Sequence, residues 1–145
     1  MRKNSTTIVI QTPGEMHFLH RIRKFVTGIA EESGFNEQDL DNIELAVDEA
    51  CANVIEHGYD PEEPEKKLTI RMEIDASKLV LSIIDQGKYF DPRSKRPADI
   101  NELIHMKRNG GLGISLINRT MDEVDYRRTP DGGNELVLIK YLKRT

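Results

Sequence analysis

The sequence lacks the features that would carry a protein across a membrane or stabilise it outside the cell. Its 145 residues include a single cysteine, Cys51, so no internal disulfide can form and a reducing compartment is expected. No apolar run is long enough for a signal peptide or a membrane span. The net charge is −4 and the 21 lysines and arginines are scattered, so nothing favours direct nucleic-acid binding. We therefore expect a cytoplasmic protein that binds neither membrane nor nucleic acid.

The residues that are present fit one globular domain. A chain of 145 residues is long enough for a single hydrophobic core. Hydrophobic residues make up 37% of the chain and charged residues 32%, an ordinary balance for a soluble protein. No internal repeat and no second-domain boundary divides the sequence, so we expect residues 1–145 to form a single domain.

Residues 40–59 predict one amphipathic helix that ends in a turn. Apolar residues recur there at steps of three and four, the spacing that lines one face of a helix. Asn36 or Asp39 can cap the start of this helix, and Gly58 fits a left-handed position just past its end. The predicted buried stripe consists of Leu40, Ile43, Val47, Ala50, Cys51 and Val54.

The segments around this helix predict a sheet built largely from hairpins. Residues 6–11 are β-branched and alternate weakly, which is typical of a strand. Thr12-Pro13 has the pattern of a helix start, and Ser33-Gly34 that of a helix end. Alternation of apolar and polar residues predicts two hairpins, formed by strands at residues 67–75, 79–84, 124–128 and 135–142. We expect an α+β fold, a two-layer sandwich with a mixed, mostly antiparallel sheet and helices on one face.

A long polar segment separates the two predicted hairpins. Residues 93–109 lack a sustained period, so they predict a loop with one short helix near residues 98–106. A loop of this length within a compact domain is usually a lid or a disordered segment. The glycine-rich run at residues 110–113 then opens a helix that continues to about residue 122.

Three features suggest a bound ligand, although each also has an ordinary structural explanation. Glu49 and Asn53 lie one helical turn apart, either as a solvated pair or as a base and a neutral metal ligand. Asp85 ends an apolar strand before Gly87, either as a turn former or as an acceptor for an exocyclic amine. The run at residues 110–113 is either a flexible turn or a phosphate-binding helix N-terminus. Together they describe a nucleotide with Mg²⁺.

Three segments, in this order, resemble the N, G1 and G2 boxes of the Bergerat-fold (GHKL) ATPases, which include histidine kinases and type II topoisomerases. They are DEACANVIEHGY at residues 48–59, DQGKYFDP at residues 85–92 and NGGLGISLINRTMDEV at residues 109–124. More narrowly, they are similar to the motifs of the small bacterial anti-sigma-factor serine kinases. Tyr89 stands where histidine kinases have a second glycine, which is typical of the anti-sigma branch. The resemblance covers nearly the whole chain and implies a Bergerat fold.

The resemblance implies a role for each matching residue. Glu49 would be the general base that activates the substrate hydroxyl, and Asn53 would bind Mg²⁺ together with the nucleotide. Asp85 would bind adenine, and Gly87 would allow close approach of the base. The backbone amides of the glycine-rich run would hold the phosphates, and a lid cation would reach the terminal phosphate. These last residues are Gly110, Gly111, Leu112, Gly113 and Arg108.

The resemblance also implies an activity and partners. The chain would be an ATP-dependent serine/threonine kinase that binds a sigma factor and phosphorylates a STAS-domain anti-anti-sigma factor. It would form a homodimer through the first strand and first helix. Two alternatives remain at this level: an ATP-binding module that sequesters a partner without kinase activity, and a kinase for a STAS partner in a pathway without a sigma factor. The presence of Glu49 favours a kinase, because a nucleotide sensor needs no base.

Overall fold

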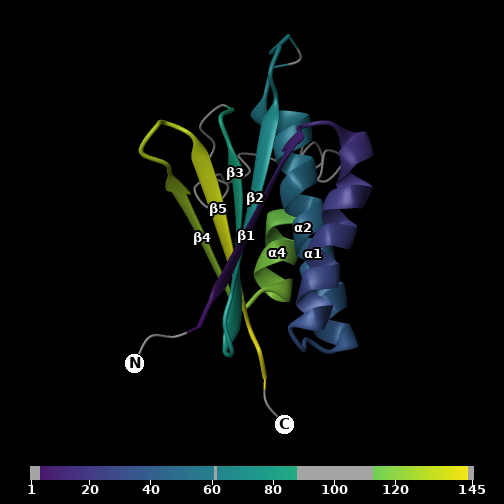
Figure 1. Ribbon diagram of the computed structural model, residues 1–145. Coiled ribbons are helices and arrows are strands. Elements are labelled where there is room, and N and C mark those ends of the chain that lie inside the picture. The colour runs from purple at the N-terminus through teal and green to yellow at the C-terminus, as the bar shows by residue number, and fades with distance from the viewer. Residues whose placement is uncertain (1–3, 61, 88–112, 144–145) are drawn as a thin grey trace.

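The computed structural model describes residues 4–60, 62–87 and 113–143, which form a five-stranded sheet with helices against one face (Figure 1). The predicted lid at residues 93–109, with its short helix, lies outside the described residues. The strands are β1 (Thr6–Pro13), β2 (Lys67–Ile74), β3 (Lys78–Asp85), β4 (Glu123–Arg128) and β5 (Asn134–Tyr141), and the helices are α1 (Leu19–Glu32), α2 (Glu37–Asn53) and α4 (Gly113–Thr120). A 3₁₀ turn at Met16–Phe18 precedes α1, and a π-helical turn at Val54–Gly58 follows α2.

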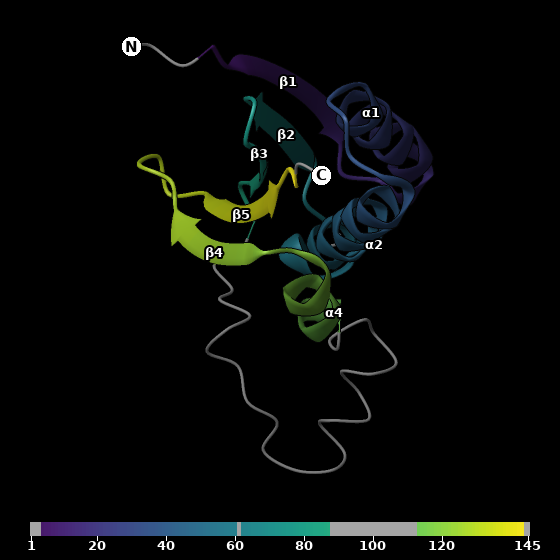
Figure 2. The ribbon, with the colours of Figure 1, turned by 90° about the horizontal axis from the view of Figure 1, so that it is seen from below.

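The sheet has the order β1-β2-β3-β5-β4, and each of these four neighbouring pairs is antiparallel. The expected α+β sandwich is confirmed, but a mixed sheet was the wrong expectation for these pairs. The reason lies in the connection between β1 and β2. A single helix between β1 and β2 would bring the chain back to the end of the sheet where β1 starts, and β2 would be parallel to β1. Here α1 and α2 run along the sheet one after the other, so the chain enters β2 from the opposite end and β2 is antiparallel to β1. Figure 2 shows α2 between α1 and α4 on one side of the sheet.

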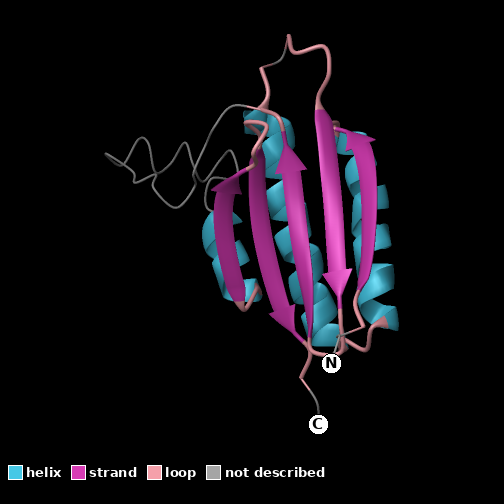
Figure 3. Ribbon diagram, turned by 60° about the vertical axis from the view of Figure 1, so that its left-hand side comes forward, coloured by secondary structure: helices cyan, strands magenta, loops and turns pink. Residues whose placement is uncertain are grey.

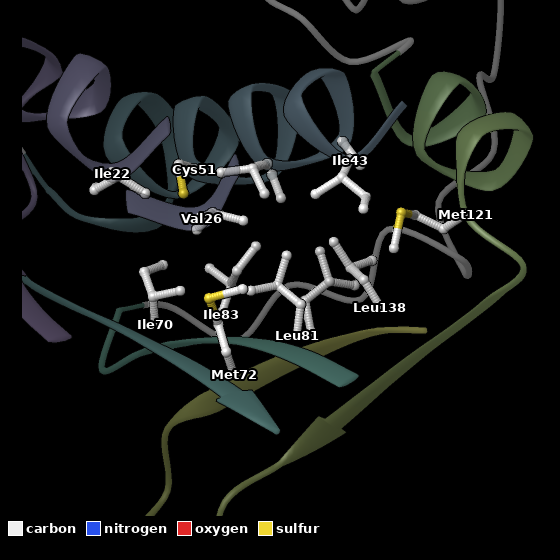
Figure 4. Close-up of a cluster of buried hydrophobic side chains, with 14 of the residues drawn as sticks. Ile22, Val26, Ile43, Cys51, Ile70, Met72, Leu81, Ile83, Met121 and Leu138 are labelled. Carbon is white, nitrogen blue, oxygen red and sulfur yellow. The ribbon is translucent and has the colours of Figure 1, made fainter. Parts of the chain in front are cut away.

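The hydrophobic core lies between this sheet face and the helices. Alternate residues of the strands point into it, and the opposite face of the sheet carries no described helix (Figure 3). Side chains of α1, α2 and the central strands meet in one layer (Figure 4). The predicted stripe of the central helix is confirmed, with Ile43, Val47, Ala50 and Cys51 buried and Leu40 and Val54 partly buried. Cys51 is a core residue with no exposed surface.

The first helix region starts differently from the sequence prediction, whereas its end is as predicted. Pro13 does not begin a helix; it is the last residue of β1, opposite Lys67. An edge strand tolerates proline because the missing N–H need not join the ladder. The helix α1 begins only at Leu19, after the 3₁₀ turn, and ends as predicted before Gly34, whose φ is 105°.

The central helix begins earlier than residue 40 and ends differently. It starts at Glu37, and the side chain of Asn36 accepts a hydrogen bond from the Asp39 amide at 2.8 Å, so Asn36 is the cap. The left-handed position predicted for Gly58 is wrong, because Gly34 and Gly132 are the positive-φ residues of the described chain. The helix instead widens into the π-helical turn that contains Gly58, and Tyr59 leaves it in an extended conformation. No helix among the described residues is long and apolar enough to cross a membrane.

Candidate functional site

The candidate site lies at the end of the sheet where β3 ends and β5 begins, next to the π-helical turn that follows α2. A pocket of about 250 Å³ opens there, lined by Gly58, Tyr59, Asp60, Glu63, Gln86 and Gly87. Two segments that are distant in sequence, the N-box and G1 motifs, therefore share one pocket wall. The outer residues Asp60 and Glu63 make its rim acidic, and they also border a second hollow beside the loop to β2.

Asp85 is the buried acid beside this pocket, directly before the lining residues Gln86 and Gly87, with 7% of its surface exposed. Its Oδ1 accepts two hydrogen bonds, from the Gly87 amide at 2.8 Å and from Asn134 Nδ2 at 3.0 Å. Its Oδ2 receives no hydrogen bond from a described residue, so this oxygen is available to a ligand donor. Burial raises the pKa of Asp85, although the hydrogen bonds from Asn134 and Gly87 oppose that shift. The residue can therefore act as a desolvated, oriented acceptor.

Asn134 is a site residue that sequence reasoning missed. It stands opposite Asp85 in the β3–β5 register, and its Nδ2 also donates to the Gly87 carbonyl at 3.3 Å. It is buried, with 2% of its surface exposed. The sequence contained one signal, because Asn134 lies two and four positions before the buried Leu136 and Leu138 and so shares their face of β5. An amide at such a core-facing position indicates a polar partner on the neighbouring strand.

Gly87 is required for a reason that the sequence did not show. A Cβ built on it would lie 2.0 Å from the carbonyl oxygen of Gly58, a distance that real side chains never reach. The residue therefore allows the G1 turn to pack directly on the end of the π-helical turn. Gly133 is similarly confined, because its Cβ would lie 2.6 Å from the Asp85 carbonyl oxygen. Close packing of backbone, rather than turn conformation, explains these two glycines.

Tyr59 joins the pieces of the pocket wall through its hydroxyl. The hydroxyl donates to the Lys67 carbonyl at 2.7 Å and accepts from the Gln86 amide at 2.9 Å. The residue is 8% exposed, and burial raises the pKa of its phenol, so the hydroxyl remains protonated at neutral pH. Sequence reasoning treated Tyr59 only as part of a motif and gave it no role.

Glu49 and Asn53 lie on α2, one turn apart and half-buried. Burial raises the pKa of Glu49, and the nearby negative charges of Asp48 and Glu56 raise it further. Asp48 itself is held by Arg23 of α1, whose Nε lies 2.9 Å from Asp48 Oδ1. Among the described residues, Glu49 makes no hydrogen bond or ion pair, so its carboxylate is free to accept a proton.

The remaining predicted residues fall mostly outside the described chain. Gly113 is the first residue of α4, which packs beside α2 (Figure 2). Arg108, Gly110, Gly111 and Leu112 lie outside the described residues. Within the described ranges, no group of three or more His, Cys, Asp or Glu side chains is arranged to hold a metal ion. The structure thus brings Asp85 and Gly87 together with the end of α2, the helix that carries Glu49 and Asn53.

Comparisons with known proteins find relatives over most of this chain. The family model of the histidine kinase-like ATPase domain matches residues 13–140. The serine-protein kinase RsbW of Halalkalibacterium halodurans is 35% identical over 142 residues, which cover 95% of this chain and 85% of that protein. The serine-protein kinase RsbW of Listeria monocytogenes is 32% identical over 139 residues, which cover 93% and 87% respectively.

A solved structure shows the same fold. It contains the RsbU and RsbW domains of a Mycobacterium tuberculosis protein and superposes with a TM-score of 0.69 at 17% identity. The match covers 97% of this chain and 33% of that longer one. The resemblance inferred from the three motifs is therefore confirmed by a family model and by relatives over almost the full length. The chain belongs to the histidine kinase-like ATPase family and, within it, is a relative of the serine-protein kinases named RsbW.

Proposed function

We propose that the protein is an ATP-dependent serine/threonine protein kinase and anti-sigma factor, whose phosphorylated substrate is a STAS-domain anti-anti-sigma factor. The observation that carries the proposal is the buried Asp85, whose Oδ1 is fully engaged and whose Oδ2 faces no described donor. Relatives named serine-protein kinase support the phosphotransferase class. The cytoplasm is the compartment in which such a kinase meets its partners.

The polar groups of the pocket fit an adenine base. Asp85 Oδ2 accepts a hydrogen bond from the exocyclic amine of adenine, a donor that guanine lacks at the same ring position. Because Asp85 is desolvated, a ligand without a donor at this position would leave Oδ2 unpaired and would bind more weakly. Gly87, packed on Gly58, keeps the wall of the pocket flat at backbone level. The site therefore favours ATP over GTP.

The polar groups of α2 fit the phosphate end of the same ligand. Asn53 offers a neutral oxygen to Mg²⁺, which keeps several waters and is held largely by substrate phosphates. The backbone amides of Gly110–Gly113 and the cation of Arg108 would hold the phosphates, as the sequence resemblance implies. When bound, ATP supplies the phosphoryl group that is transferred.

Glu49 acts as the general base for the substrate serine or threonine. Its carboxylate accepts the hydroxyl proton as the oxygen attacks, and its raised pKa makes it a stronger base than an exposed glutamate. Arg23 neutralises Asp48, which limits the repulsion that Glu49 experiences. The phosphate added to the partner then disfavours rebinding through charge repulsion and desolvation at the docking surface. Such release frees the kinase to bind a sigma factor.

The test separates the base from the nucleotide site. Glu49→Gln should leave ATP affinity, measured by calorimetry, nearly unchanged while phosphotransfer to the STAS partner falls by about 10²–10⁴-fold. Asn53→Ala should instead weaken Mg²⁺-dependent ATP binding. Glu37→Gln, at the exposed start of α2, is the matched control and should transfer phosphate at the normal rate. A normal rate in Glu49→Gln would remove the base assignment. ATP binding without any phosphotransfer in the unmodified protein would favour a sequestering module without kinase activity.

The resemblance also supports a homodimer, which we propose as the functional unit. A two-fold dimer is the commonest oligomer among soluble proteins. Sedimentation equilibrium of the purified chain, with and without ATP and Mg²⁺, tests it directly, and a monomer at all concentrations would contradict it.

A further inference from the structure

The hydroxyl of Tyr59 extends the β2–β3 pairing beyond its last strand pair. The register ends with Leu68 opposite Asp85, so the next residues, Lys67 and Gln86, have no ladder contact with each other. The Tyr59 hydroxyl bridges them, donating to the Lys67 carbonyl at 2.7 Å and accepting from the Gln86 amide at 2.9 Å. A side chain thus replaces the missing backbone hydrogen bond at the end of the sheet where the pocket opens.

This bridge fixes the backbone from which the ligand acceptor projects. Gln86 lies between Asp85 and Gly87, and the Gly87 amide is one of the two donors that orient the Asp85 carboxylate. Anchoring the Gln86 amide therefore limits rotation of the peptide planes on both sides of it. The Tyr59 hydroxyl makes two hydrogen bonds, so its removal would leave both a backbone donor and a backbone acceptor without their partner in the protein.

The position of Tyr59 also connects the pocket to α2. Tyr59 is the first residue after the π-helical turn, and the preceding Gly58 carbonyl packs against Gly87. One residue thus couples the end of the helix that carries Glu49 to the turn that carries Asp85. π-helical turns recur at functional sites, where the extra residue redirects a side chain.

We propose that Tyr59 is a positioning residue for base recognition, whose hydroxyl holds the Asp85–Gly87 turn in the orientation that selects purines with a 6-amino group, as in adenine. The proposal rests on the proposed adenine-binding role of Asp85. It assigns to Tyr59 no contact with the ligand. Its effect is on discrimination between bases rather than on stability alone.

The experiment compares two nucleotides in two variants. Dissociation constants for ATP and for purine riboside triphosphate, which lacks the amine, are measured by calorimetry in the presence of Mg²⁺. In the unmodified protein ATP binds more tightly, and Tyr59→Phe should reduce this ratio by about threefold or more. Tyr141→Phe is the matched control, because it also removes a tyrosine hydroxyl that hydrogen-bonds, to Glu123, but on an exposed part of the sheet. It should leave the ratio unchanged.

The outcomes separate this inference from the function on which it rests. Equal affinity for both nucleotides in the unmodified protein would remove the adenine role of Asp85 itself. A normal preference in the unmodified protein that persists within about twofold in Tyr59→Phe would overturn only the role of Tyr59. If Tyr59→Phe does not fold, amide exchange in the unmodified protein decides. The Gln86 amide should then be protected without nucleotide, and exchange at the rate of a free peptide would overturn the proposal.

Discussion

Replacing Lys140 by methionine should destabilise the protein more than any exposed lysine replacement. The Lys140 side chain is 7% exposed, and its Nζ donates to the Thr120 carbonyl, at the end of α4, at 2.6 Å. Asp39 Oδ1 lies 3.8 Å from the same nitrogen and Asp122 Oδ1 lies 4.0 Å from it. The lysine therefore joins β5 to the C-terminal end of α4 and to the start of α2.

The magnitude follows from these contacts. A hydrogen bond that involves a charged group contributes about 1.5–3 kcal/mol. Loss of the ammonium also leaves the buried Asp39 with no other cation partner among the described residues. The separations to both acids are long for ion pairs, so we expect a total near 3 kcal/mol rather than the upper value of about 5 kcal/mol. For a chain of this size the melting temperature should fall by about 10 °C.

Urea unfolding followed by circular dichroism measures this loss. Lys67→Met is the control, because the Lys67 side chain is 57% exposed and its ammonium lies 3.6 Å from Glu65. That replacement should change the unfolding free energy by less than about 0.5 kcal/mol. Adding Asp39→Asn to Lys140→Met should recover part of the lost stability, because Asp39→Asn removes the acid that the lysine no longer compensates. Equal stability of Lys140→Met and Lys67→Met would refute the reasoning.

Three further predictions use other parts of the structure. The Cys51 thiol is buried and its pKa is raised to about 12, so maleimide should label it only after unfolding, and labelling of the native chain would contradict its place in the core. The phosphotransfer rate should fall on acidification around a pKa above the ordinary glutamate value, because Glu49 must be ionised, and Asp48→Asn should move this limb to lower pH. Gly87→Ala should destabilise the chain by more than about 2 kcal/mol, since the added Cβ meets a backbone carbonyl at 2.0 Å. Gly28→Ala, whose Cβ meets nothing within 4 Å in α1, should be neutral or stabilising by up to about 1 kcal/mol, as urea unfolding of both variants would show.

The elements with strong local periodicity could be predicted from the sequence. The buried stripe of α2 and the alternation in β2 are set by which residues enter the core, so they are visible in a single segment. The end of β1 at Pro13 was missed, because a proline before a helical pattern has the same local signature whether or not the preceding residues pair. The edge position of β1, which permits proline there, is a property of the whole sheet.

The site could be predicted only in part. The motif residues Asp85 and Gly87 were found in their sequence context, but the partners that orient them were not. Asn134 lies 49 positions after Asp85 in the chain and reaches it only through the register of β3 with β5. Tyr59 acts through a backbone amide and a backbone carbonyl, which carry no sequence signature at all. Contacts of this kind become visible only when the register is known.

The strand order has a consequence for the sequence of events in folding. The hairpins β2–β3 and β4–β5 join neighbouring segments, so each can form early with little loop-closure entropy. The pairing of β3 with β5 instead closes the long stretch between Asp85 and Asn134, and long-range closures of this kind are slow. The side chains of Asp85 and Asn134 therefore meet only when this late step is complete. A chain in which both hairpins have formed but β3 and β5 have not yet paired would have most of its strand structure and no nucleotide site. Nucleotide would therefore bind and stabilise only chains in which the whole sheet has formed.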